Sequence, residues 1–106
     1  MNLHFHGHRP RSEELRANVV ELAEDLEMDF PNLVDCDLSL DDSVHGFRAR
    51  LRILGRGVRI AAHAECPDME DALRTAFGRA YRQLRKQRDR RIDTRRWEAR
   101  REHHAL

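Results

Sequence analysis

The chain has 106 residues, of which 37% are charged and 40% hydrophobic, and its formal net charge at pH 7 is +1. This length fits one domain with a modest core. No apolar run approaches the ~18 residues that span a membrane, and the first ten residues lack the apolar segment of a signal peptide. The two cysteines, Cys36 and Cys66, fit no metal-binding spacing. We therefore expect a cytoplasmic protein with reduced thiols and no membrane partner.

The small net charge conceals a strong asymmetry along the chain. Residues 1–47 contain 3 basic and 11 acidic residues, a net charge of −8, whereas residues 48–106 contain 17 basic and 8 acidic residues, a net charge of +9. Nearly all of the basic residues are arginines, whose planar guanidinium suits phosphate groups and stacks on bases. The second half thus favours an anionic partner, nucleic acid first, although a solvated and salt-bridged surface gives the same pattern.

The first elements are a strand and a helix. In residues 2–6 (NLHFH) apolar side chains alternate with polar ones, which predicts a short strand. Ser12 is a typical N-cap residue, and two glutamates follow it. Apolar residues then recur at helical spacing, so we expect a helix from about Glu13 to about Met28, ended by the Phe-Pro-Asn sequence at 30–32.

Three half-buried strands follow the helix. Residues 34–40 (VDCDLSL), 47–53 (FRARLRI) and 58–64 (VRIAAHA) each alternate with a period of two, as strands with one solvated face do. The GRG sequence at 55–57 predicts a tight hairpin between the last two strands. The residues expected on the buried face are Val34, Cys36, Leu38, Leu40, Phe47, Ala49, Leu51, Ile53, Val58, Ile60, Ala62 and Ala64.

The last predicted element is an amphipathic helix. Asp68 is its N-cap, and Asp71 occupies the third helical position, as in a capping box. One stripe of this helix is apolar and the opposite side is basic. The apolar repeat ends near Arg91, so we expect one domain in residues 1–91 and a charged, flexible C-terminal extension in residues 92–106.

The predicted order is β-α-β-β-β-α, which makes the fold class α+β. The apolar residues of all four strands must lie on one face of a four-stranded sheet. We therefore expect both helices to be packed on that one face. The other face stays open to solvent and carries a row of arginines.

The element order, the GRG hairpin and the segment DMEDALRTAFGRAYRQLRKQRDRR resemble the ribosome hibernation-promoting factor family, also called ribosome-associated inhibitor or protein Y, over residues 1–91. The resemblance implies a non-enzymatic stress-response protein that occupies the mRNA and tRNA channel of the small ribosomal subunit and inhibits translation in idle ribosomes. It also implies that the basic face of the last helix lies on rRNA. Longer members add a C-terminal dimerising domain, and this chain resembles a short member without one. The chain departs from the family at Glu70, where tyrosine is usual, and at Asp25 and Met28, where basic residues are usual.

The candidate RNA-binding residues come from the last helix and from the open face of the sheet. Cations that replace counterions on phosphates gain free energy from counterion release, and phosphate contacts give affinity and register without reading sequence. On the strands a second interpretation stands beside this one, because Asp35 and Asp37 could pair with the arginine row. The candidates are Arg74, Arg79, Arg82, Arg85, Lys86 and Arg90 on the helix, and Arg50, Arg52, Arg59 and His63 on the strands.

Other functions are less well supported by the sequence. It contains no nucleophile elbow, no phosphate-binding glycine loop and no convergent carboxylates, so we expect no enzyme, no cofactor and no small-molecule substrate. His4, His6 and His8 could share one strand face, as zinc ligands would, but no fourth ligand stands near them. Two alternatives remain: a general double-stranded RNA-binding protein, and a protein-interaction regulator that acts through the acidic first helix.

Overall fold

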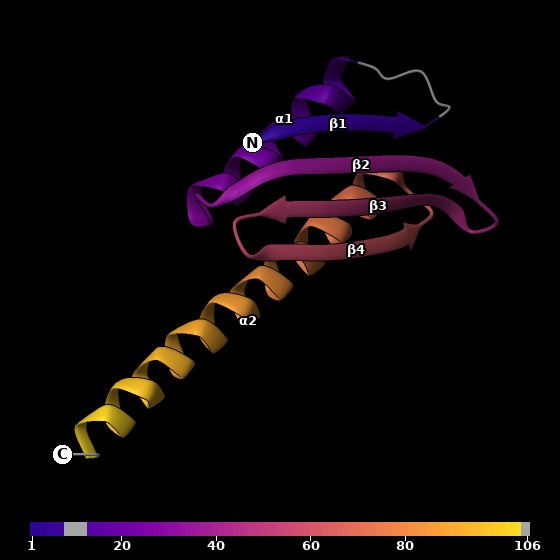
Figure 1. The fold of residues 1–106 in the computed structure, drawn as a ribbon. Coiled ribbons are helices and arrows are strands. Elements are labelled where there is room, and N and C mark those ends of the chain that lie inside the picture. The colour runs from indigo at the N-terminus through magenta and orange to yellow at the C-terminus, as the bar shows by residue number, and fades with distance from the viewer. Residues whose placement is uncertain (8–12, 105–106) are drawn as a thin grey trace.

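The protein is described here from a computed structural model, which defines the backbone of residues 1–7 and 13–104 and the side chains of residues 1–6 and 13–90. The predicted α+β fold with the order β-α-β-β-β-α is confirmed (Figure 1). The elements are β1 (Asn2–Gly7), α1 (Glu13–Asp29), β2 (Leu33–Ser43), β3 (Gly46–Gly55), β4 (Val58–Cys66) and α2 (Met69–His104).

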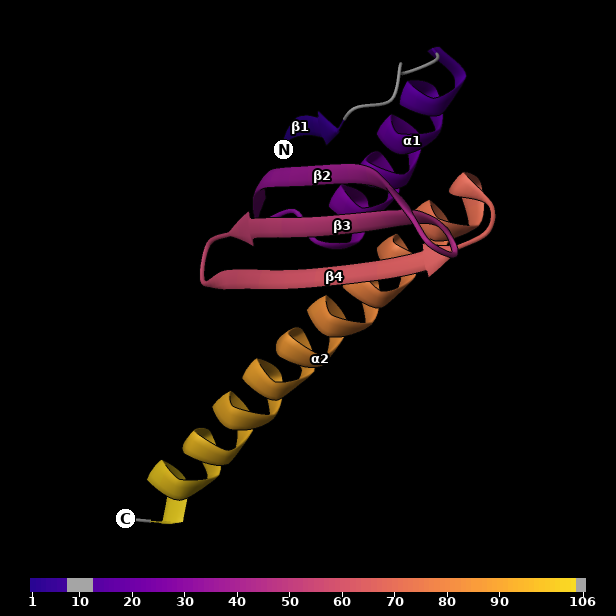
Figure 2. The same cartoon turned by 90° about the vertical axis from the view of Figure 1, so that its right-hand side faces the viewer.

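The four strands form one mixed sheet in the order β1-β2-β3-β4 (Figure 2). β1 runs parallel to β2, while β2 with β3 and β3 with β4 form antiparallel pairs. The parallel pair requires a crossover connection, and α1 supplies it. β4 is therefore one edge of the sheet and β1 the other.

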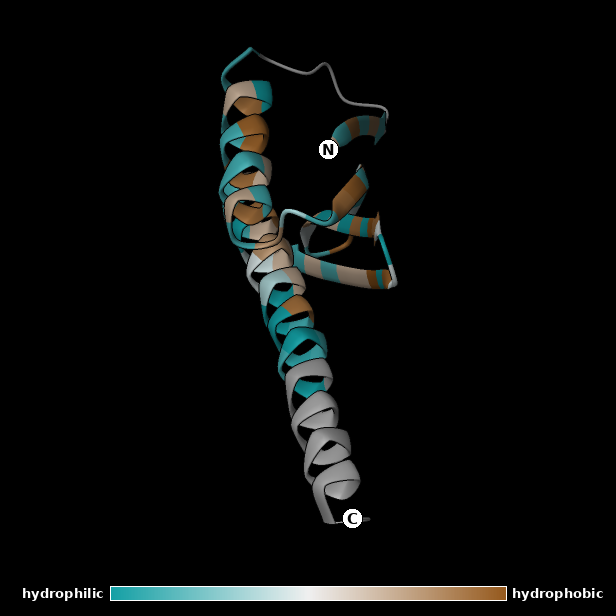
Figure 3. Cartoon of the chain, turned by 60° about the vertical axis from the view of Figure 1, so that its left-hand side comes forward, coloured by the Kyte–Doolittle hydropathy of each residue, from teal (hydrophilic) through white to brown (hydrophobic). Residues whose placement is uncertain are grey.

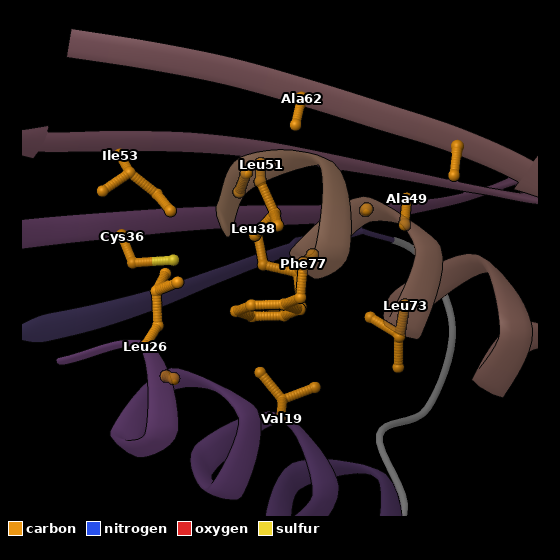
Figure 4. Close-up of a cluster of buried hydrophobic side chains, with 14 of the residues drawn as sticks. Val19, Leu26, Cys36, Leu38, Ala49, Leu51, Ile53, Ala62, Leu73 and Phe77 are labelled. Atoms are coloured by element: carbon orange, nitrogen blue, oxygen red, sulfur yellow. The ribbon is translucent and has the colours of Figure 1, made fainter. Parts of the chain in front are cut away.

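Both helices cover the same face of the sheet, as predicted (Figure 3). Val19 of α1, Phe77 of α2 and Leu38 of β2 belong to one cluster of buried side chains (Figure 4). α2 packs mainly on β3 and β4. The opposite face of the sheet is free of helices, so its side chains are available to a partner.

One predicted core residue is wrong. Val34 is 48% exposed, and its neighbour Leu33 is buried instead. The pairing of β2 with β3 shifts its register between Leu33 and Asp35. Such an irregularity inserts one residue into the alternation, so the side chains before it change faces.

α2 continues well beyond the sheet. The sequence predicted a charged extension after residue 91, and the helical backbone continues through this segment to His104, over 36 residues in all. Arginine, glutamate and alanine in this segment are good helix formers, which favours a helical backbone beyond the apolar stripe. The C-terminal half of α2 projects away from the sheet (Figures 1 and 2) and gives the molecule extents of 63 × 25 × 16 Å. The flexibility expected for residues 92–106 stays a prediction.

The start of α2 is capped as the sequence indicated. The Asp68 carboxylate accepts a hydrogen bond of 3.2 Å from the backbone N–H of Glu70. This bond satisfies one of the free N–H groups in the first helical turn. The other predicted cap, Ser12, lies outside the described residues.

Two glycines give a stability test with opposite signs. Gly46 has a φ of 128°, and a Cβ there would lie 2.5 Å from the Cys66 carbonyl oxygen, whereas a Cβ on the helical Gly78 meets nothing within 4 Å. Gly46→Ala should therefore lower the free energy of unfolding by about 2 kcal/mol or more. Gly78→Ala should raise it by about 1 kcal/mol, because glycine is costly inside a helix. Urea denaturation followed by circular dichroism measures both, and equal effects of the two changes would contradict the turn geometry.

The buried thiol gives a second test. Burial, and to a lesser degree the charge of Asp37, raises the pKa of Cys36 to about 12 from an ordinary value of 9.0, whereas Cys66 is only partly buried. Iodoacetamide at pH 8 should label Cys66 in the folded protein and Cys36 only after unfolding, as read by mass spectrometry.

The same thiol should make stability depend on pH. Between pH 9 and 12 the unfolded state ionises Cys36 while the folded state keeps it protonated, so the free energy of unfolding should fall across this window. A Cys36→Ala variant should lose that part of the decline. An unchanged pH dependence in the variant would contradict the assignment.

Candidate nucleic-acid interface

All ten sequence-predicted RNA-binding side chains are exposed, and the six on α2 fall within an arc of about 160° opposite its apolar stripe. At about 100° per residue, Arg79, Arg82 and Lys86 fall within about 60° of one another. Arg74 and Arg85 lie together at the other end of this arc, and Arg74 lines one shallow groove with Arg79 and Arg82. We call the first group, with Arg79, Arg82 and Lys86, the β4 flank, and the second group the α1 flank.

The position of the β4 flank is fixed by hydrogen bonds to the edge of the sheet. Arg79 Nη1 donates to the carbonyl oxygen of His63 at 2.6 Å, and Gln83 Nε2 donates to that of Ala61 at 2.9 Å. Both carbonyls belong to the edge strand β4, so no neighbouring strand of the sheet donates a hydrogen bond to them. These bonds cover an edge that would otherwise be open to another chain, and they hold the β4 flank against that edge.

The α1 flank has a different environment. Arg74 lies at a groove of about 210 Å³ between the helices, together with Glu21 and Asp25 of α1. One turn beyond Arg85, the Arg88 guanidinium donates to the carbonyl oxygen of Asp29 at 3.3 Å. The positive charges on this side of α2 therefore face an acidic helix.

Arg88 has a structural role that the sequence did not reveal. Its guanidinium also lies 4.8 Å from the centre of the Phe30 ring, and Phe30 packs edge-on against Tyr81. The last turn of α1 contains no basic residue of its own. Arg88 thus places a cation at the negative end of the α1 dipole and ties the end of α1 to the projecting part of α2. Nothing in the local sequence around Arg88 signals this contact, because its partner lies 59 residues away.

The open face of the sheet is a lattice of polar side chains set by the strand register. Arg52 of β3 lies opposite Asp37 of β2 and Ala61 of β4, and Arg50 lies opposite Ser39 and His63. A shallow groove of about 510 Å³ crosses these rows. The other polar residues that line this open-face groove are Arg48 and Glu65.

Some arginines of this face are already neutralised and others are not. Arg48 forms an ion pair with Glu65, and Arg50 lies 4.0 Å from Asp41. Within the part of the chain whose side chains are described, Arg52 and Arg59 have no acidic partner. The sequence left open whether the arginine row pairs with acids or faces RNA. The structure divides the row between paired and unpaired arginines.

The two aspartates that the sequence offered as partners lie near histidines instead. His4 Nε2 is 3.7 Å from Asp35, and His6 Nε2 is 3.7 Å from Asp37. β2 thus carries most of the acidic residues of the open face, with the β1 histidines beside two of them, and the arginines lie on β3 and β4. In residues 1–6 and 13–90, no group of three or more His, Cys, Asp or Glu side chains could hold a metal ion. His8 lies outside these residues.

Comparison with known proteins identifies the family. The family model described as sigma 54 modulation protein / S30EA ribosomal protein matches residues 2–92. The chain belongs to this family. Family membership makes it a ribosome-associated modulation protein, and such proteins act in ribosome hibernation and translation regulation. No curated protein matches the chain in sequence.

Solved structures share the fold at low sequence identity. A ribosomal subunit interface protein from Coxiella burnetii has a TM-score of 0.78 and 17% identity, and the match covers 84% of this chain and 99% of that one. The N-terminal domain of Thermus thermophilus Protein Y has a TM-score of 0.73 and 18% identity, and the match covers 81% of this chain and 98% of that one.

Among the helical residues that the structure describes, none forms a segment long and apolar enough to cross a membrane.

The structural role of Arg88 can be tested against a neighbour on the same helix. Arg88→Gln removes the bond to the Asp29 carbonyl and the contact with the Phe30 ring, and should lower the free energy of unfolding by about 1–2 kcal/mol. Arg85→Gln removes the same charge from an exposed position and should change stability by less than about 0.5 kcal/mol. Urea denaturation measures both, and equal stabilities would show that Arg88 does not hold α1 and α2 together.

Proposed function

We propose that the protein binds the small ribosomal subunit in the channel of mRNA and tRNA, and that it thereby inhibits translation in idle ribosomes. It acts without catalysis and without a cofactor, on cytoplasmic ribosomes. The rRNA contacts come from the β4 flank of α2 and from the adjoining basic side of the open face. Family membership supports a ribosomal partner, and the charge arrangement supports the choice of surface.

The observation that carries the proposal is the continuity of unneutralised positive charge across the β4 edge. Arg82 and Lys86 are exposed and have no acidic partner among the described side chains. The Arg79 and Gln83 bonds hold this flank against β4. Arg59 lies on the open face of β4, and Arg52 lies on the open face of the neighbouring strand β3. A surface of this kind gains free energy by releasing counterions from RNA phosphates.

Two pairs of variants on one helix test the surface. Arg82→Gln/Lys86→Gln neutralises the β4 flank, and Arg74→Gln/Arg85→Gln removes the same charge from the α1 flank. Arg79 is left unchanged because its side chain holds α2 to β4. Co-sedimentation with purified small subunits at several salt concentrations measures the affinity.

We expect wild-type protein to pellet with the subunits and to dissociate as salt rises. The β4-flank variant should bind on the order of tenfold more weakly, and each lost phosphate contact should reduce the slope of log K against log salt by about 0.7–0.9. The α1-flank variant should bind nearly as wild type does. In a cell-free translation reaction, the same ranking should hold for inhibition.

The alternatives make different predictions in the same experiment. Equal weakening of both variants would show that overall charge, not the β4 flank, drives binding. A general double-stranded RNA-binding protein would bind an isolated duplex as tightly as the subunit. A regulator that acts through α1 would lose binding with Glu21→Gln/Asp25→Gln and keep it with the β4-flank variant.

A further inference from the structure

The open-face groove is lined at one position by a small side chain, that of Ala61. Ala61 lies directly opposite Arg52, and Arg59 and His63 occupy the neighbouring positions of the same face of β4. These positions are about 7 Å apart along a strand. Ala61 is thus a small side chain surrounded by large ones, and it is itself exposed. The groove of about 510 Å³ has the size of a site for a small organic group.

The walls of the groove differ in hydrogen-bonding character. On the β3 and β4 side, Arg52 and His63 present a planar cation and an imidazole, which can stack on a base or bind a phosphate. On the β2 side, the carboxylate of Asp37 and the hydroxyl of Ser39 line the same groove. A carboxylate repels a bare phosphate, but it accepts hydrogen bonds from the amino group of a base. Donors on one wall and acceptors on the other fit a nucleotide better than a simple anion.

The groove is separated from the β4 flank of α2 by a single strand. The Arg79 and Gln83 side chains reach the outer carbonyls of β4 at His63 and Ala61, the same two residues that line the groove from the other side. An RNA strand with phosphates on Arg82 and Lys86 therefore needs to cross only the width of β4 to reach the groove. In a duplex the bases are stacked and paired inside, so their edges cannot turn into a groove on a flat sheet.

We infer that the open-face groove holds one unpaired nucleotide of an RNA strand whose neighbouring phosphates lie on the β4 flank of α2. The inference rests on the proposed function in taking RNA as the ligand, and it adds that the RNA is single-stranded at this point. The base lies over Ala61 between Arg52 and His63, with its amino edge toward Asp37.

Fluorescence anisotropy with a labelled single-stranded oligoribonucleotide of about 12 nucleotides, and with a duplex of about 16 base pairs, tests the inference. Ala61→Leu fills the groove without changing charge, at an exposed position that leaves the core untouched. Arg52→Ala removes a cation from the groove, and Arg56→Ala removes an equal charge from the exposed β3–β4 turn. Circular dichroism confirms that each variant is folded, and Arg52→Ala carries the test if Ala61→Leu is not.

We expect wild type to prefer the single strand. Ala61→Leu and Arg52→Ala should each weaken single-strand binding by about fivefold or more, as the loss of one stacked base does, and should leave duplex binding nearly unchanged. Arg56→Ala should weaken both slightly and equally. The inference is overturned if Ala61→Leu binds the single strand as tightly as wild type does. It is also overturned if Arg52→Ala and Arg56→Ala lose the same amount of single-strand affinity.

Co-sedimentation separates this inference from the proposed function. A protein that pellets with small subunits but shows no preference for the single strand keeps the proposed function and overturns the groove assignment. A protein that prefers the single strand and loses that preference in Ala61→Leu, yet does not pellet, supports the groove and overturns the ribosomal target.

Discussion

Alanine side chains line both surfaces where α2 packs on the sheet. Ala72, Ala76 and Ala80 are fully buried on α2, and Ala62 and Ala64 are buried on β4. Small side chains on both sides let the helix axis approach the sheet closely, since interiors are packed without voids. This close approach brings Arg79 and Gln83 within hydrogen-bonding reach of the β4 carbonyls. A larger residue at these alanines would lift α2 away and separate the β4 flank from the open face.

The pairing of charges on the open face determines which arginines remain available. The side chains of β3 and β4 share rows fixed by the antiparallel register, so Arg48 meets Glu65 directly. Arg52 meets Ala61 in the next row but one and has no such partner. An exposed ion pair adds little stability, so the main effect of the pairing is to neutralise positive charge on the surface. It concentrates the unneutralised positive charge toward Arg52 and Arg59, near the turn between β3 and β4.

Much of the fold could be predicted from the sequence because its elements are amphipathic and clearly bounded. Period-two alternation placed β3 and β4, and the cap at Asp68 placed the start of α2. Alternation failed at Val34 because a register irregularity depends on the neighbouring strand and leaves no local signal. Periodicity could not place the end of α2, because the apolar repeat lapses near residue 91 while the helical backbone continues to His104.

The exposure of the candidate side chains could be predicted from the sequence, but their grouping on the surface could not, and their binding to RNA stays a prediction. All ten candidate side chains are exposed as expected. A helical wheel gives the angle of each cation about α2, but not which element lies beside it. Only tertiary contacts show that Arg79 is bonded to the β4 edge and that Arg74 lies near acidic residues of α1. The same holds for Arg88, whose partner carbonyl comes from the far end of α1.

The separation of charge between the two halves of the chain has a physical consequence for the proposed complex. α1 carries seven acidic residues and one arginine, and it lies on the side of α2 opposite the β4 flank. A uniformly basic protein would be attracted to RNA in any orientation, since phosphate contacts carry no sequence information. An acidic helix repels RNA from one side, so long-range attraction favours encounters through β4 and the adjoining flank. Asp25, where the family resemblance implied a basic residue, adds to this acidic side of the molecule.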